Sequence, residues 1–159
     1  MAFEFYMTIS GTQQSFKGES ERSAYKDKIP GLYFYSGVNA ARHAGTGRVT
    51  GARIHEPIII RKKIGSQSPL IVKALTANET LKTVKFEFVN ASAEGKETIF
   101  YKITLTNATI ISHKMVLPDV QGPDKHIEAY EEISFLFQKI EWSHETAKTI
   151  TTDDWNGSN

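Results

Sequence analysis

Residues 98–110, TIFYKITLTNATI, decide the fold that this sequence predicts. Apolar side chains occupy every second position as far as Leu105, which is the period of a half-buried β-strand. After residues 106–107 the apolar positions move by one, to Ala108 and Ile110. Such a shift sends the later side chains to the other face of a sheet unless a bulge absorbs it. Long strands with shifts of this kind allow a sheet to bend and close.

Four further stretches alternate in the same way, at residues 3–10, 54–64, 84–89 and 132–142. The last of them also changes phase, after residues 138–139. Several strands separated by glycine and polar turns predict a mainly β protein, either a β-barrel or a tightly packed sandwich. Bulky side chains are expected to fill its interior, namely Phe3, Phe5, Phe86, Phe88, Phe135 and Phe137.

Composition and charge narrow the classes of function. The 159 residues suit a single domain, residues 1–159, with a real core. The chain has 19 Lys and Arg against 18 Asp and Glu, so no excess of positive charge favours a nucleic-acid partner. No stretch approaches the roughly 20 apolar residues of a membrane-spanning helix, so no membrane insertion is expected. The N-terminus lacks a basic region and a signal peptide, so synthesis in the cytoplasm is expected.

Residues 55–75, HEPIIIRKKIGSQSPLIVKAL, join a strand to the one helix that the sequence predicts, at residues 69–78. Ser68 is expected to be the N-cap, and Pro69 suits the first helical position. The helix is too short to be stable alone, so its apolar face must pack against the barrel. The turn at residues 66–68 offers amide groups to an anion, but its glycine spacing matches no phosphate-binding motif. We interpret it as a structural corner.

Residues 36–53, SGVNAARHAGTGRVTGAR, form a long inter-strand connection with little apolar periodicity. The segment contains Arg42, Arg48 and Arg53 and no acidic residue. Loops this long inside a compact domain are uncommon and are usually functional or disordered. Two interpretations stay open, namely a mobile excursion and an arm that contacts another molecule, most simply an identical neighbour. An acidic patch for such an arm is offered by Glu128, Glu131 and Glu132.

The reactive residues predict no catalytic, cofactor-binding or metal-binding site. None of the five histidines lies three to five residues from another, so the spacing of a zinc-type pair is missing. The sequence has no Gly-x-Ser-x-Gly elbow and no cysteine. The histidines are expected at the surface or in turns, and the paired carboxylates Asp153 and Asp154 are expected to be solvated. We therefore expect a protein that is not an enzyme.

Four segments, in this order, resemble the Hcp family, the tube-forming proteins of bacterial type VI secretion systems. They are TGRVTGARIHEPIIIRKKIGSQSPLIVKAL (46–75), ETLKTVKFEF (79–88), IFYKITLTNATIISHK (99–114) and EEISFLFQKIEWSHETAKTITTDDW (131–155). They contain a Gly-Arg loop, a His-x-Pro strand, a Ser-Pro helix, a Thr-Asn-Ala strand and a Glu-Ile-Trp strand. The ordered set covers nearly the whole chain and is more specific than any one segment.

The resemblance implies a compact β-barrel of two antiparallel sheets with one short flanking helix. It also implies homohexameric rings, which stack into a tube inside a contractile sheath. The implied partners are this sheath, the needle-tip proteins and small effector proteins in the lumen. The protein is then both a structural part and a secreted product with a role in virulence, exported without a cleaved signal peptide. The family's extended loop reaches a neighbouring subunit, and this role carries over to residues 36–53, with Arg48 and Arg53 as the matching basic positions. A C-terminal toxin extension is not expected after residues 153–155.

Apolar residues on the otherwise polar side of a strand suit an interface between subunits. With the basic residues of the long loop, the predicted interface set is Arg42, Arg48, Arg53, Ile59, Val89, Phe100 and Leu136. Two alternatives remain. A phage-type tail tube protein would share the barrel and the ring, and a monomeric barrel that binds a small apolar ligand would need an unfilled interior.

Overall fold

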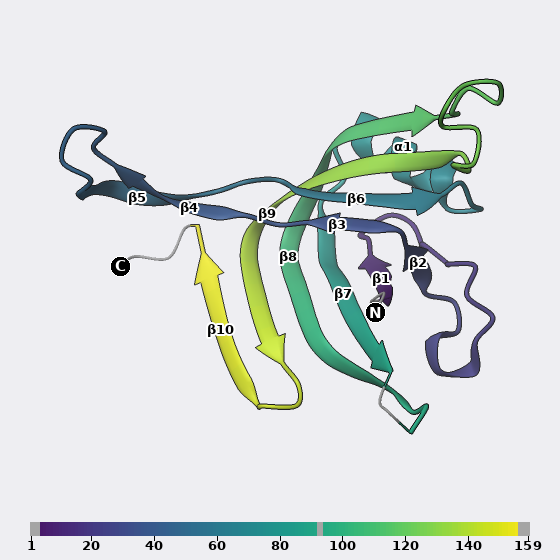
Figure 1. The fold of residues 1–159 in the computed structure, drawn as a ribbon, viewed down its shortest axis with the longest axis horizontal. Helices are drawn as coiled ribbons and strands as arrows, with labels where there is room; N and C mark the ends of the chain where they lie inside the picture. Colours follow the sequence, from purple (N-terminus) through teal and green to yellow (C-terminus); the bar gives the residue numbers. More distant parts are fainter. Residues whose placement is uncertain (1–3, 92–93, 156–159) are drawn as a thin grey trace.

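The computed structural model describes residues 4–91 and 94–155, which form mainly β-strands (Figure 1). In chain order the elements are β1 (Glu4–Ser10), the 3-10 helix η1 (Ser23–Tyr25), β2 (Ile29–Gly31), β3 (Tyr33–Tyr35), β4 (Val38–Arg42), β5 (Val49–His55), β6 (Ile58–Lys63), α1 (Ser68–Thr76), β7 (Leu81–Ala91), β8 (Glu97–Val116), β9 (Tyr130–His144) and β10 (Thr149–Asp154).

Within the described residues, eight strands form one antiparallel sheet that nearly closes into a barrel. The strand order is β2-β1-β7-β8-β9-β6-β3, and β10 pairs with β9 outside this path. The two ends of the path, β2 and β3, are separated in the chain by Leu32 alone. The N–H of Leu32 donates to the backbone oxygen of Arg61 at 2.8 Å, so the chain itself bridges the gap. The predicted barrel is confirmed, and the second sheet is the hairpin of β4 and β5.

The two predicted changes of phase face each other in neighbouring strands. Thr106 of β8 pairs with Lys139 of β9, and the ladder continues past this point without a change of register. Asn107 has a φ of 51°, and its Nδ2 donates to Oε1 of Gln138 at 2.8 Å. Because both strands change face together, the sheet bends here without a bulge. The changes of register lie elsewhere, between Phe88 and Val89 of β7 and between Ile110 and Ser112 of β8.

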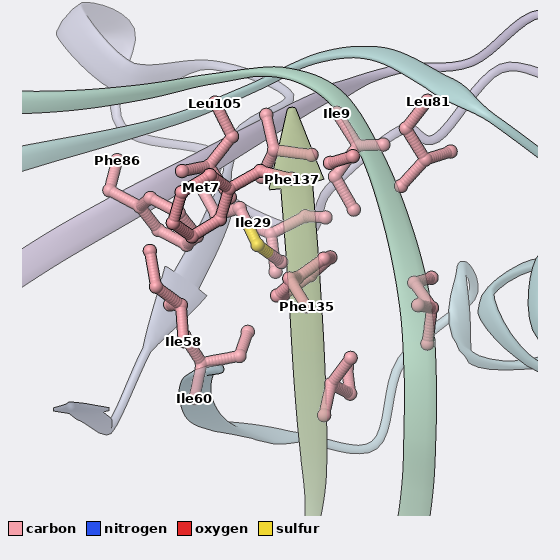
Figure 2. Close-up of a cluster of buried hydrophobic side chains, with 14 of the residues drawn as sticks. Met7, Ile9, Ile29, Ile58, Ile60, Leu81, Phe86, Leu105, Phe135 and Phe137 are labelled. Atoms are coloured by element: carbon pink, nitrogen blue, oxygen red, sulfur yellow. The ribbon is translucent and has the colours of Figure 1, made fainter. Parts of the chain in front are cut away.

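Apolar side chains fill the inside of the barrel (Figure 2). Met7, Phe86 and Phe135 are completely buried there, and Phe88 is packed against them from a half-buried position. The predicted inward set is confirmed for the described residues, and Phe3 lies outside them. This packing argues against the ligand-binding alternative, which needs an empty interior.

The predicted helix is confirmed with different ends, since α1 spans Ser68–Thr76 instead of residues 69–78. Gln67 occupies the N-cap position without a side-chain cap, so Ser68 is not the N-cap but the first helical residue. The hydroxyl group of Ser68 instead takes part in a buried polar network. Ile71 and Ala74 are buried in the core, as the apolar face predicts.

The segment predicted as a long loop is mostly a β-hairpin, which projects away from the barrel (Figure 1, blue). We call residues 36–56 the arm. At its tip the N–H of His43 donates to the oxygen of Arg48 at 2.8 Å, and Gly47 has a φ of 69°. The predicted long inter-strand loop is corrected to a hairpin, which the sequence did not reveal because apolar periodicity marks a strand only where one face is buried. Both faces of the arm are largely exposed.

At the root of the arm, the sequence predicted the wrong side of the strand to be buried. Ile54 was expected to share the buried side of Ile58 and Ile60, but it is exposed, whereas His55 is buried. The strand is interrupted at residues 56–57, between β5 and β6. Proline has no N–H for a ladder, so the alternation cannot be counted across this break.

Candidate subunit-contact site

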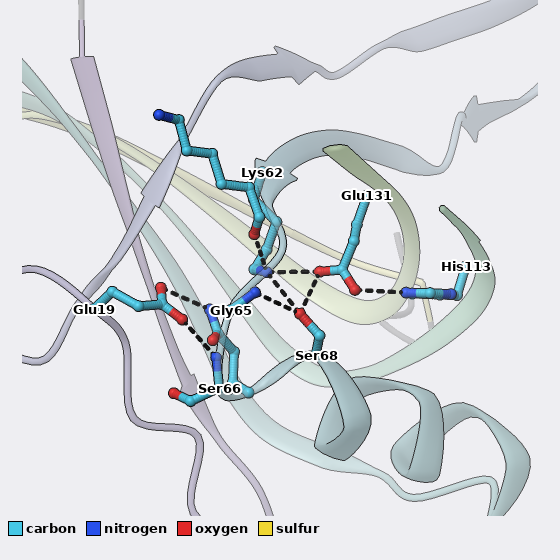
Figure 3. Close-up of polar contacts among 9 residues, drawn as sticks. Glu19, Lys62, Gly65, Ser66, Ser68, His113 and Glu131 are labelled. Atoms are coloured by element: carbon cyan, nitrogen blue, oxygen red, sulfur yellow. Dashed lines mark hydrogen bonds and ion pairs between the residues drawn. The ribbon is translucent and has the colours of Figure 1, made fainter. Parts of the chain in front are cut away.

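The corner at residues 66–68 is filled by a carboxylate of the same chain (Figure 3). The N–H of Ser66 donates to Oε1 of Glu19 at 2.9 Å, and Nε2 of Gln67 donates to Oε2 of Glu19 at 3.2 Å. The interpretation as a structural corner is confirmed, since Glu19 takes the place of an external anion.

Beside this corner lies a buried network in which Lys62 and Glu131 form an ion pair (Figure 3). Nζ of Lys62 donates to Oε2 of Glu131 and to the backbone oxygen of Lys63, each at 2.6 Å. Oγ of Ser68 donates to Oε2 of Glu131 at 2.8 Å, and Nε2 of His113 lies 3.0 Å from Oε1. Burial favours a higher pKa for Glu131, but the hydrogen bonds from Lys62, His113 and Ser68 outweigh it and lower the pKa. The network joins β6, β8, β9 and α1.

Of the three carboxylates expected to receive an arm, Glu131 is buried and unavailable to a partner, and all three already bind cations of the same chain. The pairs are Lys63 with Glu128 at 2.7 Å, Lys62 with Glu131 at 2.6 Å and Arg61 with Glu132 at 3.0 Å.

Charged side chains tie the root of the arm to β10. Nε and Nη2 of Arg53 donate to the two carboxylate oxygens of Asp153 at 2.9 and 2.7 Å. Nε2 of His55 lies 2.6 Å from Oδ2 of Asp153, and Nη2 of Arg53 also donates to the backbone oxygen of Asp154 at 2.9 Å. Hydrogen bonds from Arg53 and His55 lower the pKa of Asp153 to about 2. We call Arg53, His55 and Asp153 the clamp.

Aromatic rings surround the histidine of the clamp. The ring of His55 lies 5.3 Å from that of Phe137, 6.1 Å from that of Trp142 and 5.1 Å from that of Trp155, between centroids. The N–H of Trp155 donates to the backbone oxygen of Gln138 at 2.9 Å, which fixes this end of the chain against β9. The arm, β9 and Trp155, which directly follows β10, thus share one aromatic cluster.

An open groove lies next to Trp155, where β8 and β9 bend. Its lining includes the apolar side chains of Ile111, Leu136 and Trp155, all of them exposed. The amide side chains of Asn107 and Gln138 also line it. We call this surface the outer groove. It combines apolar area with hydrogen-bonding groups, as protein–protein contact surfaces do.

The structure places the predicted interface residues in different surroundings. Arg42 and Arg48 are exposed on the arm, and Leu136 is 40% exposed in the outer groove. Ile59 and Phe100 are half-buried on β6 and β8. Arg53 was expected to face a neighbour, but its guanidinium group binds Asp153 of its own chain.

The structure removes Val89 from the predicted interface set. It was expected on an exposed outer face, but it is 4% exposed and packs with Tyr6 and Tyr25. The two tyrosine rings are stacked with centroids 4.3 Å apart, and Arg22 donates to the hydroxyl oxygen of Tyr6 at 2.9 Å. The segment that contains η1 therefore covers this part of the sheet, and Val89 is unavailable to a partner.

Sequence reasoning missed His55 and Asp153. Both side chains were expected to face solvent. Both predictions are wrong, because the two side chains bind each other although the residues lie 98 positions apart in the chain. One signal was present in the sequence, since His55 directly precedes the break at residues 56–57 and follows Arg53 at a spacing of two. Side chains two apart on a strand point to the same side.

In residues 4–91 and 94–155, no group of three or more His, Cys, Asp or Glu side chains is arranged to hold a metal ion. No helix in these ranges is long and apolar enough to cross a membrane.

Comparison with known proteins gives matches over nearly the whole chain. Residues 6–144 match the family model described as type VI secretion system effector, Hcp. The Major exported protein of Pseudomonas aeruginosa is 31% identical over 166 aligned residues, which cover 98% of this chain and 96% of that protein.

Solved structures of Hcp proteins have the same fold. One crystal structure of an Hcp protein has a TM-score of 0.91 at 24% identity and covers 99% of this chain and 100% of that chain. Hcp1 of E. coli EAEC 042, in mutant form, has a TM-score of 0.86 at 24% identity over 97% and 99% of the two chains. The secreted protein Hcp3 of Pseudomonas aeruginosa has a TM-score of 0.76 at 28% identity over 98% and 100%.

Proposed function

The chain belongs to the Hcp family of type VI secretion system proteins, and from this premise we propose that it is the secreted subunit of the secretion tube. In this role, residues 1–159 act as one domain and six copies form a ring. Rings stack into a tube that contacts the contractile sheath and the needle-tip proteins, and small effector proteins occupy its lumen. The role is structural, without a catalytic step or cofactor, and export follows synthesis in the cytoplasm without a cleaved signal peptide.

The observation that carries this proposal is the arm, which leaves the barrel with apolar side chains uncovered. Val49 is 68% exposed, and Val38 and Ile54 are also exposed. A two-stranded hairpin is only marginally stable alone in water, and exposed apolar surface on a protein marks a contact site. A second copy of the chain supplies the surface that the arm lacks.

The outer groove is the surface that we assign to a neighbour's arm. Leu136, Ile111 and Trp155 match the apolar side chains of the arm, and Asn107 and Gln138 provide hydrogen bonds to its strand edge. Because the arm and the groove are different surfaces, their contact is head-to-tail. Repeated head-to-tail contacts close into a ring when the rotation between copies permits it.

The proposed interface keeps most of the predicted residues. Arg42 and Arg48 reach the neighbour from the arm, and Leu136 receives it in the outer groove. Ile59 and Phe100 contribute half-buried apolar area along the barrel flank. Arg53 acts within its own subunit and orients the arm.

The mass of the purified protein tests this proposal. At micromolar concentration, size-exclusion chromatography with light scattering should give about six times the chain mass of 17.8 kDa. Negative-stain electron microscopy should show annular particles in the same fraction. A stable monomer without annular particles would exclude the ring.

A further inference from the structure

Trp155 belongs to two sites at once. With Leu136 it lines the outer groove. Its ring also lies 5.1 Å from that of His55, and Nε2 of His55 lies 2.6 Å from Oδ2 of Asp153. A continuous series of contacts therefore runs from the groove to the root of the arm through these side chains.

The arm depends on contacts at its root for its orientation. Within the described residues its two strands form a sheet of their own and share no ladder with the barrel. The root is held by the clamp and by Tyr35 of β3, whose hydroxyl group donates to Oε2 of Glu56 at 2.7 Å. Of these contacts, the clamp alone also reaches β10.

Asp153 of the clamp belongs to β10, and within the described residues this strand pairs with a neighbouring strand on one side only. Within the described residues β10 pairs with β9 alone, and Ile150 of β10 is exposed. Edge segments with few buried contacts open more easily than central strands. A molecule that settles on Trp155 in the outer groove therefore restrains β10, and with it the carboxylate of Asp153 that holds Arg53 and His55.

From this geometry we propose that the clamp couples the outer groove to the arm of the same subunit. When a neighbour's arm fills the groove, it fixes Trp155 and Asp153, and the subunit's own arm is then held ready for the next neighbour. This inference rests on the proposed ring, in which every subunit both receives and donates an arm. Because such a coupling is reciprocal, it makes ring closure cooperative.

A dilution series followed by mass photometry tests the coupling with the full chain. The wild-type protein should pass from monomer to ring with few partial assemblies. Asp153→Asn should raise the concentration for half-assembly by about tenfold and let species of two to five subunits accumulate, as expected for the loss of a typical coupling. The matched control is Glu128→Gln, which removes the exposed pair with Lys63 and should assemble as the wild type does. An Asp153→Asn protein with wild-type assembly would overturn the inference.

Hydrogen exchange below the assembly concentration separates coupling from a general loss of stability. In Asp153→Asn and in Trp155→Ala, amides of β5 should exchange faster while those of residues 103–105 in β8 keep their protection. Equal acceleration in both strands would mean global destabilisation and would reject the coupling. If the wild-type protein never assembles, the proposed ring fails, yet this exchange comparison still decides whether Trp155 restrains the arm.

Discussion

Nζ of Lys62 lies 2.6 Å from Oε2 of Glu131, and the two residues are 0% and 2% exposed. Neither charge is stable in this position without the other, because water does not reach them. Ser68 and His113 also donate to this carboxylate, so both of its oxygens accept hydrogen bonds. It holds the start of α1 against the barrel strands.

Removing one member of this pair should destabilise the fold strongly. Lys62→Met leaves the charge of Glu131 buried without its cation, and we expect the free energy of unfolding in urea to fall by about 3–5 kcal/mol. Lys62→Met combined with Glu131→Leu should recover part of this loss, since no unpaired charge remains.

The adjacent lysine provides the matched control. Lys63→Met breaks the ion pair with Glu128. In this pair the side chain of Lys63 is 63% exposed and that of Glu128 is 70% exposed. Exposed pairs contribute less than about 1 kcal/mol, so this variant should unfold close to the wild type. Equal losses at the two positions would show that burial does not determine the effect.

Acid should weaken the clamp through Asp153. Its pKa is lowered from 3.8 to about 2 by hydrogen bonds from Arg53 and His55, so the folded state binds this proton less readily than the unfolded state. The stabilisation is therefore present above the unfolded pKa of 3.8 and is lost as the pH falls through about 2. The difference in urea midpoint between the wild type and Asp153→Asn should be constant above about pH 5 and shrink below it. A difference that grows towards pH 2 would contradict the assignment.

Most of the barrel could be predicted because its side chains alternate against one buried interior. The phase shifts after residues 106–107 and 138–139 were visible in the sequence, although not that they face each other. The arm was not predicted as a hairpin because neither of its faces packs on a core, and a strand without a buried face leaves no alternation. Its presence was indicated only by length, glycine content and the family resemblance.

The site was predictable only in part, for a different reason. Leu136 stood out because an apolar residue on a polar face is visible locally. The clamp joins Arg53 and Asp153 across 100 positions of the chain, and local patterns do not report such a pairing. Val89 had the same local signature as Leu136, but the segment around Tyr25, which covers it, carries no periodic signal.

Asn107 should show how much the bend depends on its backbone. Its φ of 51° is costly for a residue with a Cβ atom and free for glycine. Both Asn107→Ala and Asn107→Gly lose the hydrogen bond to Gln138, so their difference isolates the backbone. We expect the alanine variant to be less stable than the glycine variant by about 1 kcal/mol in urea unfolding. Equal stability would indicate that the strand relaxes to a negative φ.

The same change at Leu136 and Val89 should separate assembly from folding. Leu136 is exposed in the outer groove, so Leu136→Asp should still unfold in one cooperative transition as a folded barrel while light scattering shows loss of the ring. Val89 is buried with Tyr6 and Tyr25, and Val89→Asp places a charge where water is absent.

We expect Val89→Asp to lose about 3 kcal/mol or more of folding free energy, and any loss of the ring in this variant follows from unfolding. Ile127→Asp, at an exposed apolar position outside the groove, should affect neither property. Rings that persist in Leu136→Asp would remove the outer groove from the interface. A well-folded Val89→Asp protein without rings would return Val89 to the interface, because burial within the subunit would then not explain its effect.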